Sequence, residues 1–410
     1  MQQIVDRVKK IALSSVLTGS LSLGLAACGT SAPSVSSQSH APYVLGMVEA
    51  QTGPYAFLGM PEVNSADLAV KQINAAGGVH GHPLKLVVLD EKSSPTTAVE
   101  DFRQLIQTEH PLAVLGPEDT GGTMSSISEI QSSHISMISD ASDAEVVQPA
   151  SQRQWVFKMP PVDTIPMQTI LNYLKAHHLY RVAFVYVNLS YGTGALADFQ
   201  KIAPLQGFKL VTSESVDITS TNDVSQLAAL KAASPAPQAI VVWDIPPSAD
   251  IVAQAYTSLG LHIPIFYSDG VATNAFLTIG KSAVNGAYVA ATKIFIANQL
   301  PNSDPQKSIL QKYISSYNKE YGSSPSGPAN MFGGFGYDDV YLAKDAILAA
   351  GKNPTPTSVR NALEHLTFTG VTGILHLSPT NHNGLTGSQE VLMQVVNGQW
   401  KWVKGYNGTP

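Results

Sequence analysis

From Tyr43 onward, short runs of apolar residues alternate with longer segments of helical periodicity. The apolar runs are VLGMV (44–48), LKLVVLD (84–90), LAVLG (112–116), ISMIS (135–139), RVAFVYV (181–187), FKLVTS (208–213), AIVVW (239–243) and PIFYS (264–268). Continuous Val, Ile and Leu runs separated by amphipathic segments are typical of parallel strands that are covered by helices on both faces. The pattern therefore predicts an α/β fold that is doubly wound and Rossmann-like.

Helices are expected between these runs, over 61–76, 94–108, 307–321 and 338–350. The first is followed by the paired glycines Gly77 and Gly78, and the second opens with Ser94 and Pro95, which are favoured residues at helix ends and helix starts. The number of strand–helix units exceeds what one sheet normally holds. We therefore expect two such domains side by side.

The first 27 residues follow a different pattern. MQQIVDRVKK carries three basic residues, and the apolar stretch after it is interrupted only by Ser, Thr and Gly. This layout is that of a secretory signal peptide. The alternatives are a buried N-terminal helix and a membrane-spanning helix, but spanning requires about 20 strongly apolar residues. Residues 1–27 are therefore expected to be a signal peptide, which makes the mature protein extracytoplasmic.

The only cysteine of the 410 residues, Cys28, follows this stretch. LAAC (25–28) resembles a bacterial lipobox, in which the cysteine is acylated and the chain is cut just before it. Cys28 would then anchor the protein to the cell membrane, at the cell surface or in the periplasm. The alternative is a free thiol near an ordinary cleavage site. Residues 28–42 are expected to be the lipidated cysteine and a flexible tether, since the part after Cys28 is rich in Ser and Pro.

Composition and motifs exclude several function classes. Charged residues make up only 13% of the chain and the net charge is −6, which disfavours nucleic-acid binding. There is no nucleophile elbow, no HExxH and no GxGxxG after a strand, so neither an enzyme nor a cofactor is expected. HGH (80–82) and the pair at 177–178 are interpreted as turn and surface histidines, not metal ligands. FGGFGYDD (332–339) is interpreted as close backbone packing at a helix start.

Ligands of open α/β sheets bind beyond the carboxyl ends of the strands. The loops at these positions are EAQTGPYAFLG (49–59), GPEDTGGT (116–123), SDASDA (139–144), VNLSYGTG (187–194), WDIPPSAD (243–250) and YSDGVATN (267–274). They are rich in hydroxyl groups, glycines, carboxylates and aromatic rings. Helix starts and hydroxyl groups accept a carboxylate, and buried carboxylates accept an ammonium group. The loops therefore predict a small polar or zwitterionic ligand.

The stretches TGPYAFLG (52–59) and SADLAVKQINAAGGVHGHPLKLVVLDEKSSPTTAV (65–99) resemble the opening of the branched-chain amino acid (Leu/Ile/Val) binding proteins, which serve ABC importers. LAVLGPEDTGGTMSSI, YGTGALADFQ, GVATNAF, GYDDVYLAKDAI and GVTGILHLSP follow in the family's order. The resemblance covers nearly all of 43–410. It implies a type I periplasmic binding protein: a monomer that grips its ligand between two lobes joined by three crossovers and delivers it to a permease and ATPase complex.

By motif position, the crossings are expected near 159–161, 291–293 and 369–373. The lobes implied are 43–160 with 292–369 for lobe one, and 161–291 with 370–410 for lobe two.

The resemblance also implies ligand contacts in the first lobe. Thr120 stands where the family has a hydroxyl group that holds the ligand α-carboxylate together with neighbouring amides, here those beside Gly121. Ala141 and Ser142 match a carbonyl and a hydroxyl group that touch both ends of the ligand. A register shift of one residue would bring in Asp143.

In the second lobe, Tyr191 matches the family's cleft tyrosine and Asp269 matches the acidic partner of the ligand ammonium group. Two positions depart from the pattern. Leu58 lies where leucine-binding members often have a tyrosine, and the second-lobe aromatic residue is displaced, with Trp243 or Ile245 as candidates.

Four further acids, Glu118, Asp119, Asp140 and Asp244, lie near the expected cleft. They are interpreted either as solvated charges at helix starts or as a sign of a ligand more cationic or hydroxyl-rich than leucine. Two functions stay open at this point: a solute receptor of an ABC importer, and a ligand sensor that regulates a signalling partner. A secreted hydrolase is a third, less favoured one.

Overall fold

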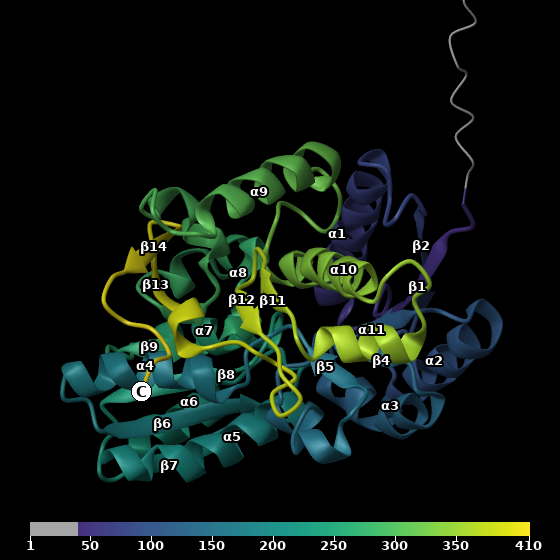
Figure 1. Ribbon diagram of the computed structural model, residues 1–410. Coiled ribbons are helices and arrows are strands. Elements are labelled where there is room, and N and C mark those ends of the chain that lie inside the picture. The colour runs from purple at the N-terminus through teal and green to yellow at the C-terminus, as the bar shows by residue number, and fades with distance from the viewer. Residues whose placement is uncertain (1–39) are drawn as a thin grey trace, which may run out of the picture. The chain divides into compact units, whose positions relative to one another are not determined.

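The computed structural model describes residues 40–410 (Figure 1). The predictions for the signal peptide, for Cys28 and for the tether up to residue 39 lie outside the described residues. None of the helices in the described part of the chain combines the length and the apolar character needed to cross a membrane.

The N-terminal sheet is parallel throughout, with the order β2-β1-β3-β4-β5. Its strands are β1 (Tyr43–Glu49), β2 (Leu84–Asp90), β3 (Ala113–Leu115), β4 (Ser136–Ser139) and β5 (Val156–Lys158). The helices packed around it are α1 (Ala56–Ala75), α2 (Pro95–Glu109), α3 (Thr120–Ser133), α9 (Lys307–Tyr321), α10 (Met331–Ala349) and α11 (Pro356–Leu363). We call this sheet with its helices the first lobe.

The second lobe contains a larger sheet with the order β14-β13-β10-β9-β8-β6-β7, in which β13 runs antiparallel to both neighbours. Its strands are β6 (Arg181–Val187), β7 (Lys209–Val216), β8 (Ala239–Trp243), β9 (Ile265–Tyr267), β10 (Tyr288–Ala291), β13 (Val391–Val396) and β14 (Gln399–Val403). Its helices are α4 (Thr164–Ala176), α5 (Ser190–Ile202), α6 (Val224–Ala232), α7 (Ser248–Ser258) and α8 (Asn274–Gly280).

Alternate residues of each strand enter different cores, which explains the continuous apolar runs. In β6, Val182 and Phe184 pack with α4 and α5, whereas Ala183 and Val185 pack in the core on the other face with α6 and α7. The first sheet is covered in the same way, by α2 and α3 on one face and α1 and α10 on the other. The predicted doubly wound α/β fold and each of its predicted strands are confirmed.

The chain passes between the lobes after β5, after β10, and again between the antiparallel pair β11 (Thr367–Thr369) and β12 (Ile374–His376) and the strand β13. Three crossovers therefore join the lobes, as expected. The exact lobe limits near 160, 291 and 369 stay a prediction.

Two predicted helices differ from the observed ones at their starts. Helix α1 begins at Ala56, five residues before the expected start, and holds Pro61 in its interior. Helix α10 begins at Met331, so the glycine-rich stretch lies inside this helix and not before it. The close packing expected there is confirmed, because a Cβ atom on Gly336 would lie 2.4 Å from the carbonyl oxygen of Glu62 in α1.

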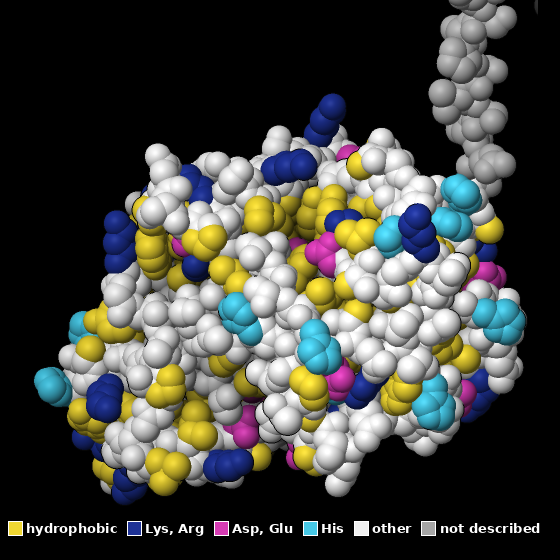
Figure 2. Space-filling view, in the orientation of Figure 1, with side chains coloured by type: hydrophobic (Ala, Val, Ile, Leu, Met, Phe, Trp, Pro, Cys, Tyr) yellow, Lys and Arg dark blue, Asp and Glu magenta, His cyan; other side chains and the backbone are white. Residues whose placement is uncertain are grey.

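The surface reflects the low charge content of the sequence. On the face shown in Figure 2, charged side chains are scattered among uncharged ones. The histidines of HGH and of the pair at 177–178 lie in turns or at a helix end near the surface, as interpreted.

Candidate ligand site

A cavity of about 170 Å³, open to solvent, lies between the two lobes. The strands of both sheets end toward it, as expected for parallel α/β sheets. Its first-lobe lining is Tyr55, Leu58, Pro95, Glu118, Asp119, Thr120, Gly121, Ser142, Met331, Phe332 and Phe335, and its second-lobe lining is Leu189, Ser190, Tyr191, Ile245, Asp269 and Gly270. A concave site with an apolar lining and a few polar groups suits a small molecule.

The second-lobe side of the cavity carries an oriented carboxylate. The hydroxyl group of Tyr191 donates a hydrogen bond to Asp269 Oδ1 (3.1 Å) and lies 2.9 Å from Ser268 Oγ. Burial raises the pKa of Asp269 to about 6, although the Tyr191 hydrogen bond and the charge of Lys158 act against this rise. Asp269 is therefore ionised at neutral pH and can accept hydrogen bonds from a ligand cation.

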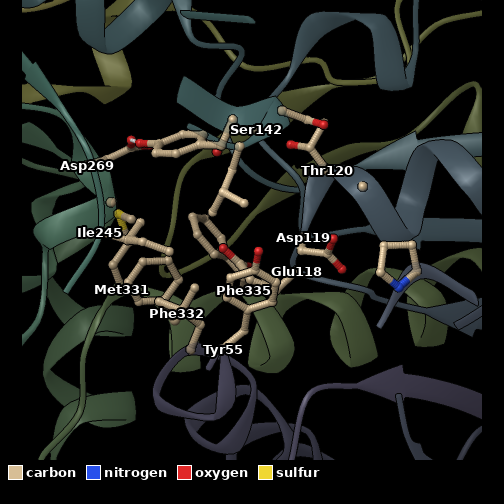
Figure 3. A pocket seen from close by; sticks show the side chains of 17 residues that line it. Tyr55, Glu118, Asp119, Thr120, Ser142, Ile245, Asp269, Met331, Phe332 and Phe335 are labelled. Atoms are coloured by element: carbon tan, nitrogen blue, oxygen red, sulfur yellow. Dashed lines mark hydrogen bonds between the residues drawn. The ribbon is translucent and has the colours of Figure 1, made fainter. Parts of the chain in front are cut away.

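The first-lobe side presents the N-terminus of α3, on the side of the cavity opposite Asp269 (Figure 3). Asp119 caps this helix by accepting a hydrogen bond of 2.7 Å from the backbone N–H of Gly122. Thr120 and Gly121 form the first helical turn and line the cavity. Backbone N–H groups at a helix start attract an anion, such as a carboxylate.

Ser142, on the loop after β4, also lines the cavity, and its carbonyl oxygen accepts a hydrogen bond from Lys158 Nζ. Lys158 is fully buried, and its Nζ also donates to the carbonyl oxygen of Pro161 at 3.2 Å. This lysine therefore ties the loop after β4 to the segment that leaves the first lobe.

Three residues expected in the ligand site do not line the cavity. Trp243 is fully buried and stacks on Phe184 in the core between the second sheet and α5. Ile245, the other candidate, lines the cavity because it lies two residues farther along, beyond the end of β8. Ala141 is fully buried in the first-lobe core. Asp143 instead caps the turn that follows by accepting a hydrogen bond of 2.7 Å from Glu145 N.

The sequence analysis missed the apolar wall of the cavity. Phe332 and Phe335 lie one turn apart on α10 with their rings in an edge-to-face arrangement, and Met331 lies beside them (Figure 3). The i, i+3 spacing of two phenylalanines was a usable signal. The interpretation of this stretch rested on its glycines alone.

The extra acids are not all solvated. Asp140 and Asp244 are fully buried, which contradicts that interpretation for both. Asp244 Oδ1 accepts hydrogen bonds from Ser248 Oγ and from the backbone N–H of Ile245. Glu118 and Asp119 line the cavity together with Asp269, and the lining residues include no basic side chain. Asp269, which is ionised at neutral pH, therefore favours a ligand with a cationic group.

Comparisons with known proteins agree with this architecture. The chain is 23% identical over 363 residues to a protein of Brucella melitensis named Leu/Ile/Val-binding protein homolog 1, covering 87% of this chain and 89% of that one. Two solved structures share the fold: an extracellular ligand-binding receptor from Rhodopseudomonas palustris HaA2 (TM-score 0.81, 24% identity, 88% and 100% coverage), and a branched-chain amino acid transporter substrate binding protein from Streptococcus pneumoniae in complex with isoleucine (TM-score 0.75, 22% identity, 88% and 98% coverage). Residues 42–399 match the family model described as periplasmic binding protein. The chain therefore belongs to the periplasmic binding protein family.

Proposed function

We propose that this chain is the receptor of an ABC importer and binds an amino acid, or a similar small zwitterion, between its two lobes. The observation that carries the proposal is the pairing of Asp269, held by Tyr191, with the N-terminus of α3 at Thr120 on the other side of the same cavity. An ammonium group matches the first, and a carboxylate matches the second.

Family membership makes the chain a solute-binding protein and not an enzyme, and it places the protein outside the cytoplasm. The Leu/Ile/Val specificity in the name of the Brucella relative supports an α-amino acid as ligand. The apolar wall of Phe332, Phe335 and Ile245 gives room for an aliphatic side chain. In this proposal Cys28 carries the lipid, and the protein acts as a monomer that delivers ligand to a permease and ATPase complex.

The test is calorimetric titration of the purified full chain, unfolded and refolded to remove carried-over ligand, with amino acids, amides and small carboxylates. At least one amino acid is expected to bind. Asp269→Asn is expected to weaken binding of amine-bearing compounds by at least about 30-fold, since breaking a buried charge pair costs about 2–5 kcal/mol. Asp217→Asn, at an exposed position of the same lobe, is the control and should bind normally. Lack of binding by every compound tested, or equal affinities of the Asp269→Asn and Asp217→Asn variants, would contradict the proposal.

A further inference from the structure

Carboxyl side chains from five segments of the first lobe converge beside the ligand cavity. They are Glu49 at the end of β1, Glu62 in α1, Glu118 on the loop before α3, Asp140 after β4 and Asp339 in α10. Glu49, Glu62, Asp140 and Asp339 are fully buried. One carboxylate oxygen from each of Glu49, Glu62 and Asp140 lies within 4.8 Å of the other two.

Apart from carboxyl–carboxyl contacts within the cluster, most of these oxygen atoms have no hydrogen-bond partner within residues 40–410. Both oxygens of Glu62, Asp140 and Asp339 lack one, and so does one oxygen of Glu49 and one of Glu118. The other oxygen of Glu49 accepts only a 3.4 Å hydrogen bond from Glu118 N. Glu62 thus directs an unpartnered, fully buried carboxylate at two others. An isolated buried carboxylate is costly, so such a group requires a cation or a proton.

The charge of Lys158 acts on Asp140, but this lysine does not supply the cation that the cluster requires. Its Nζ is hydrogen-bonded to the carbonyl oxygens of Ser142 and Pro161. In the described part of the chain, no ion pair involves a member of the cluster.

We propose that Glu49, Glu62 and Asp140 bind a divalent cation of the Ca²⁺ class, with Asp339 and Glu118 as further oxygen ligands. The donors are all carboxylate oxygens, which hard cations prefer, and the cluster lacks the His and Cys donors typical of zinc. Mg²⁺ usually keeps several waters and takes only one or two carboxylates, whereas Ca²⁺ accepts about six to eight oxygen ligands. A buried cluster of carboxyl groups therefore fits Ca²⁺ better.

The site adjoins the ligand cavity without being part of it. Glu118 is the shared residue, because it lines the cavity and has its unpartnered oxygen in the buried cluster. A cation that engages Glu118 fixes the position of this side chain in the cavity wall. Cation binding is therefore coupled to ligand binding, although the cation site does not depend on the identity of the ligand.

Protons compete with the cation for the same oxygens. Burial, reinforced by the neighbouring carboxylates, raises the pKa of Glu49 and Glu62 well above the usual range, and burial raises the pKa of Asp140 to about 7. The cation-free cluster consequently holds protons that metal binding must displace.

The experiment uses the full chain after treatment with a chelator, followed by equilibrium dialysis against CaCl₂, MgCl₂ or MnCl₂ and thermal unfolding in each salt. We expect one Ca²⁺ per chain and a higher unfolding temperature in CaCl₂. Glu62→Gln is expected to lower the Ca²⁺ affinity at least about tenfold and to remove the thermal shift.

Asp250→Asn is the matched control, because Asp250 is a fully buried carboxylate of the second lobe with both oxygens unpartnered. It should leave Ca²⁺ binding unchanged. If the unaltered chain binds no cation, the proposal is overturned, and the buried carboxyl groups are instead neutralised by shared protons. If the chain prefers Mg²⁺ or Mn²⁺, the assignment to the Ca²⁺ class is overturned. Dialysis of the unaltered chain decides this even if Glu62→Gln fails to fold. Amino acid binding is measured in a separate titration, so failure of the cation site can be distinguished from failure of the proposed ligand site.

Discussion

The hydroxyl group of Tyr191 lies 3.1 Å from Oδ1 of Asp269, and both side chains line the cavity. The tyrosine comes from the start of α5 and the aspartate from the turn after β9, so this hydrogen bond joins two loops at the edge of the second sheet. Its role is to fix the direction of a carboxylate that burial would otherwise drive toward its neutral form.

Tyr191→Phe is expected to weaken binding of an amine-bearing ligand by about tenfold or more, since a hydrogen bond to a charged group contributes about 1.5–3 kcal/mol. Calorimetric titration measures the effect. Tyr186→Phe removes a hydroxyl group from a residue of β6 that does not line the cavity, and it serves as the control. Equal affinities of the two variants would exclude this role of the hydroxyl group.

Ligand affinity should depend on pH through Asp269. The pKa of this carboxyl is about 6 in the ligand-free protein, so it is ionised above that value and neutral below it. Affinity for an ammonium ligand is therefore expected to be constant above about pH 7 and to fall about tenfold per unit at acid pH below 6. Titrations at several pH values test this. A carboxylate that lacks the amine should not show the same fall, and a flat profile for the amino acid would contradict the assignment.

Phe332→Ala should alter ligand selectivity. The substitution opens the apolar wall, so ligands with large aliphatic side chains should lose about tenfold or more in affinity relative to glycine or alanine. The ratio of affinities is the readout, since truncating a buried phenylalanine also lowers the free energy of unfolding by about 3–5 kcal/mol. Phe199→Ala, in the second-lobe core away from the cavity, should destabilise the protein without changing this ratio.

Asp250→Asn is expected to stabilise the protein at alkaline pH. Burial raises the pKa of Asp250 from 3.8 to about 7, so the folded state binds more protons than the unfolded state between these values. Stability from this group is highest below about pH 4 and is lost as the pH rises through 7. At pH 8 the variant should gain at least about 1 kcal/mol in unfolding free energy over the unaltered chain. Denaturant unfolding at about pH 5 and pH 8 measures the gain, and parallel pH profiles would contradict it.

The central strands were predictable because they are buried on both faces, which leaves a continuous apolar run such as RVAFVYV, whereas the edge strands β2 and β7 are only half-buried. The loops around the cavity were also predictable, because parallel strands place their carboxyl ends at one edge of the sheet. The position of a single side chain was harder to predict. Trp243 is the last residue of β8, whereas Ile245 lies two residues beyond the strand and lines the cavity. The residue at which β8 ends depends on its pairing with β6 and β9.

The acidic cluster was not predictable from local sequence. Glu49, Glu62, Asp140 and Asp339 are far apart in the chain, and carboxylates near helix starts are usually solvated. Their burial is decided by the packing of α10 along α1, which no short window of sequence reveals. The sequence analysis considered only histidines as metal ligands, and a site made of carboxylates lies outside that interpretation.

The contact between α1 and α10 also governs the order in which the protein becomes functional during its synthesis. Helix α1 is made early, but its partner α10 follows only after strands β6 to β10 of the other lobe have been made. Until then Glu62 lacks the helix that covers it, and the cavity lacks Phe332 and Phe335. A nascent chain that ends before Met331 therefore lacks the apolar wall of the cavity, and this wall is completed only after β6 to β10 have been made.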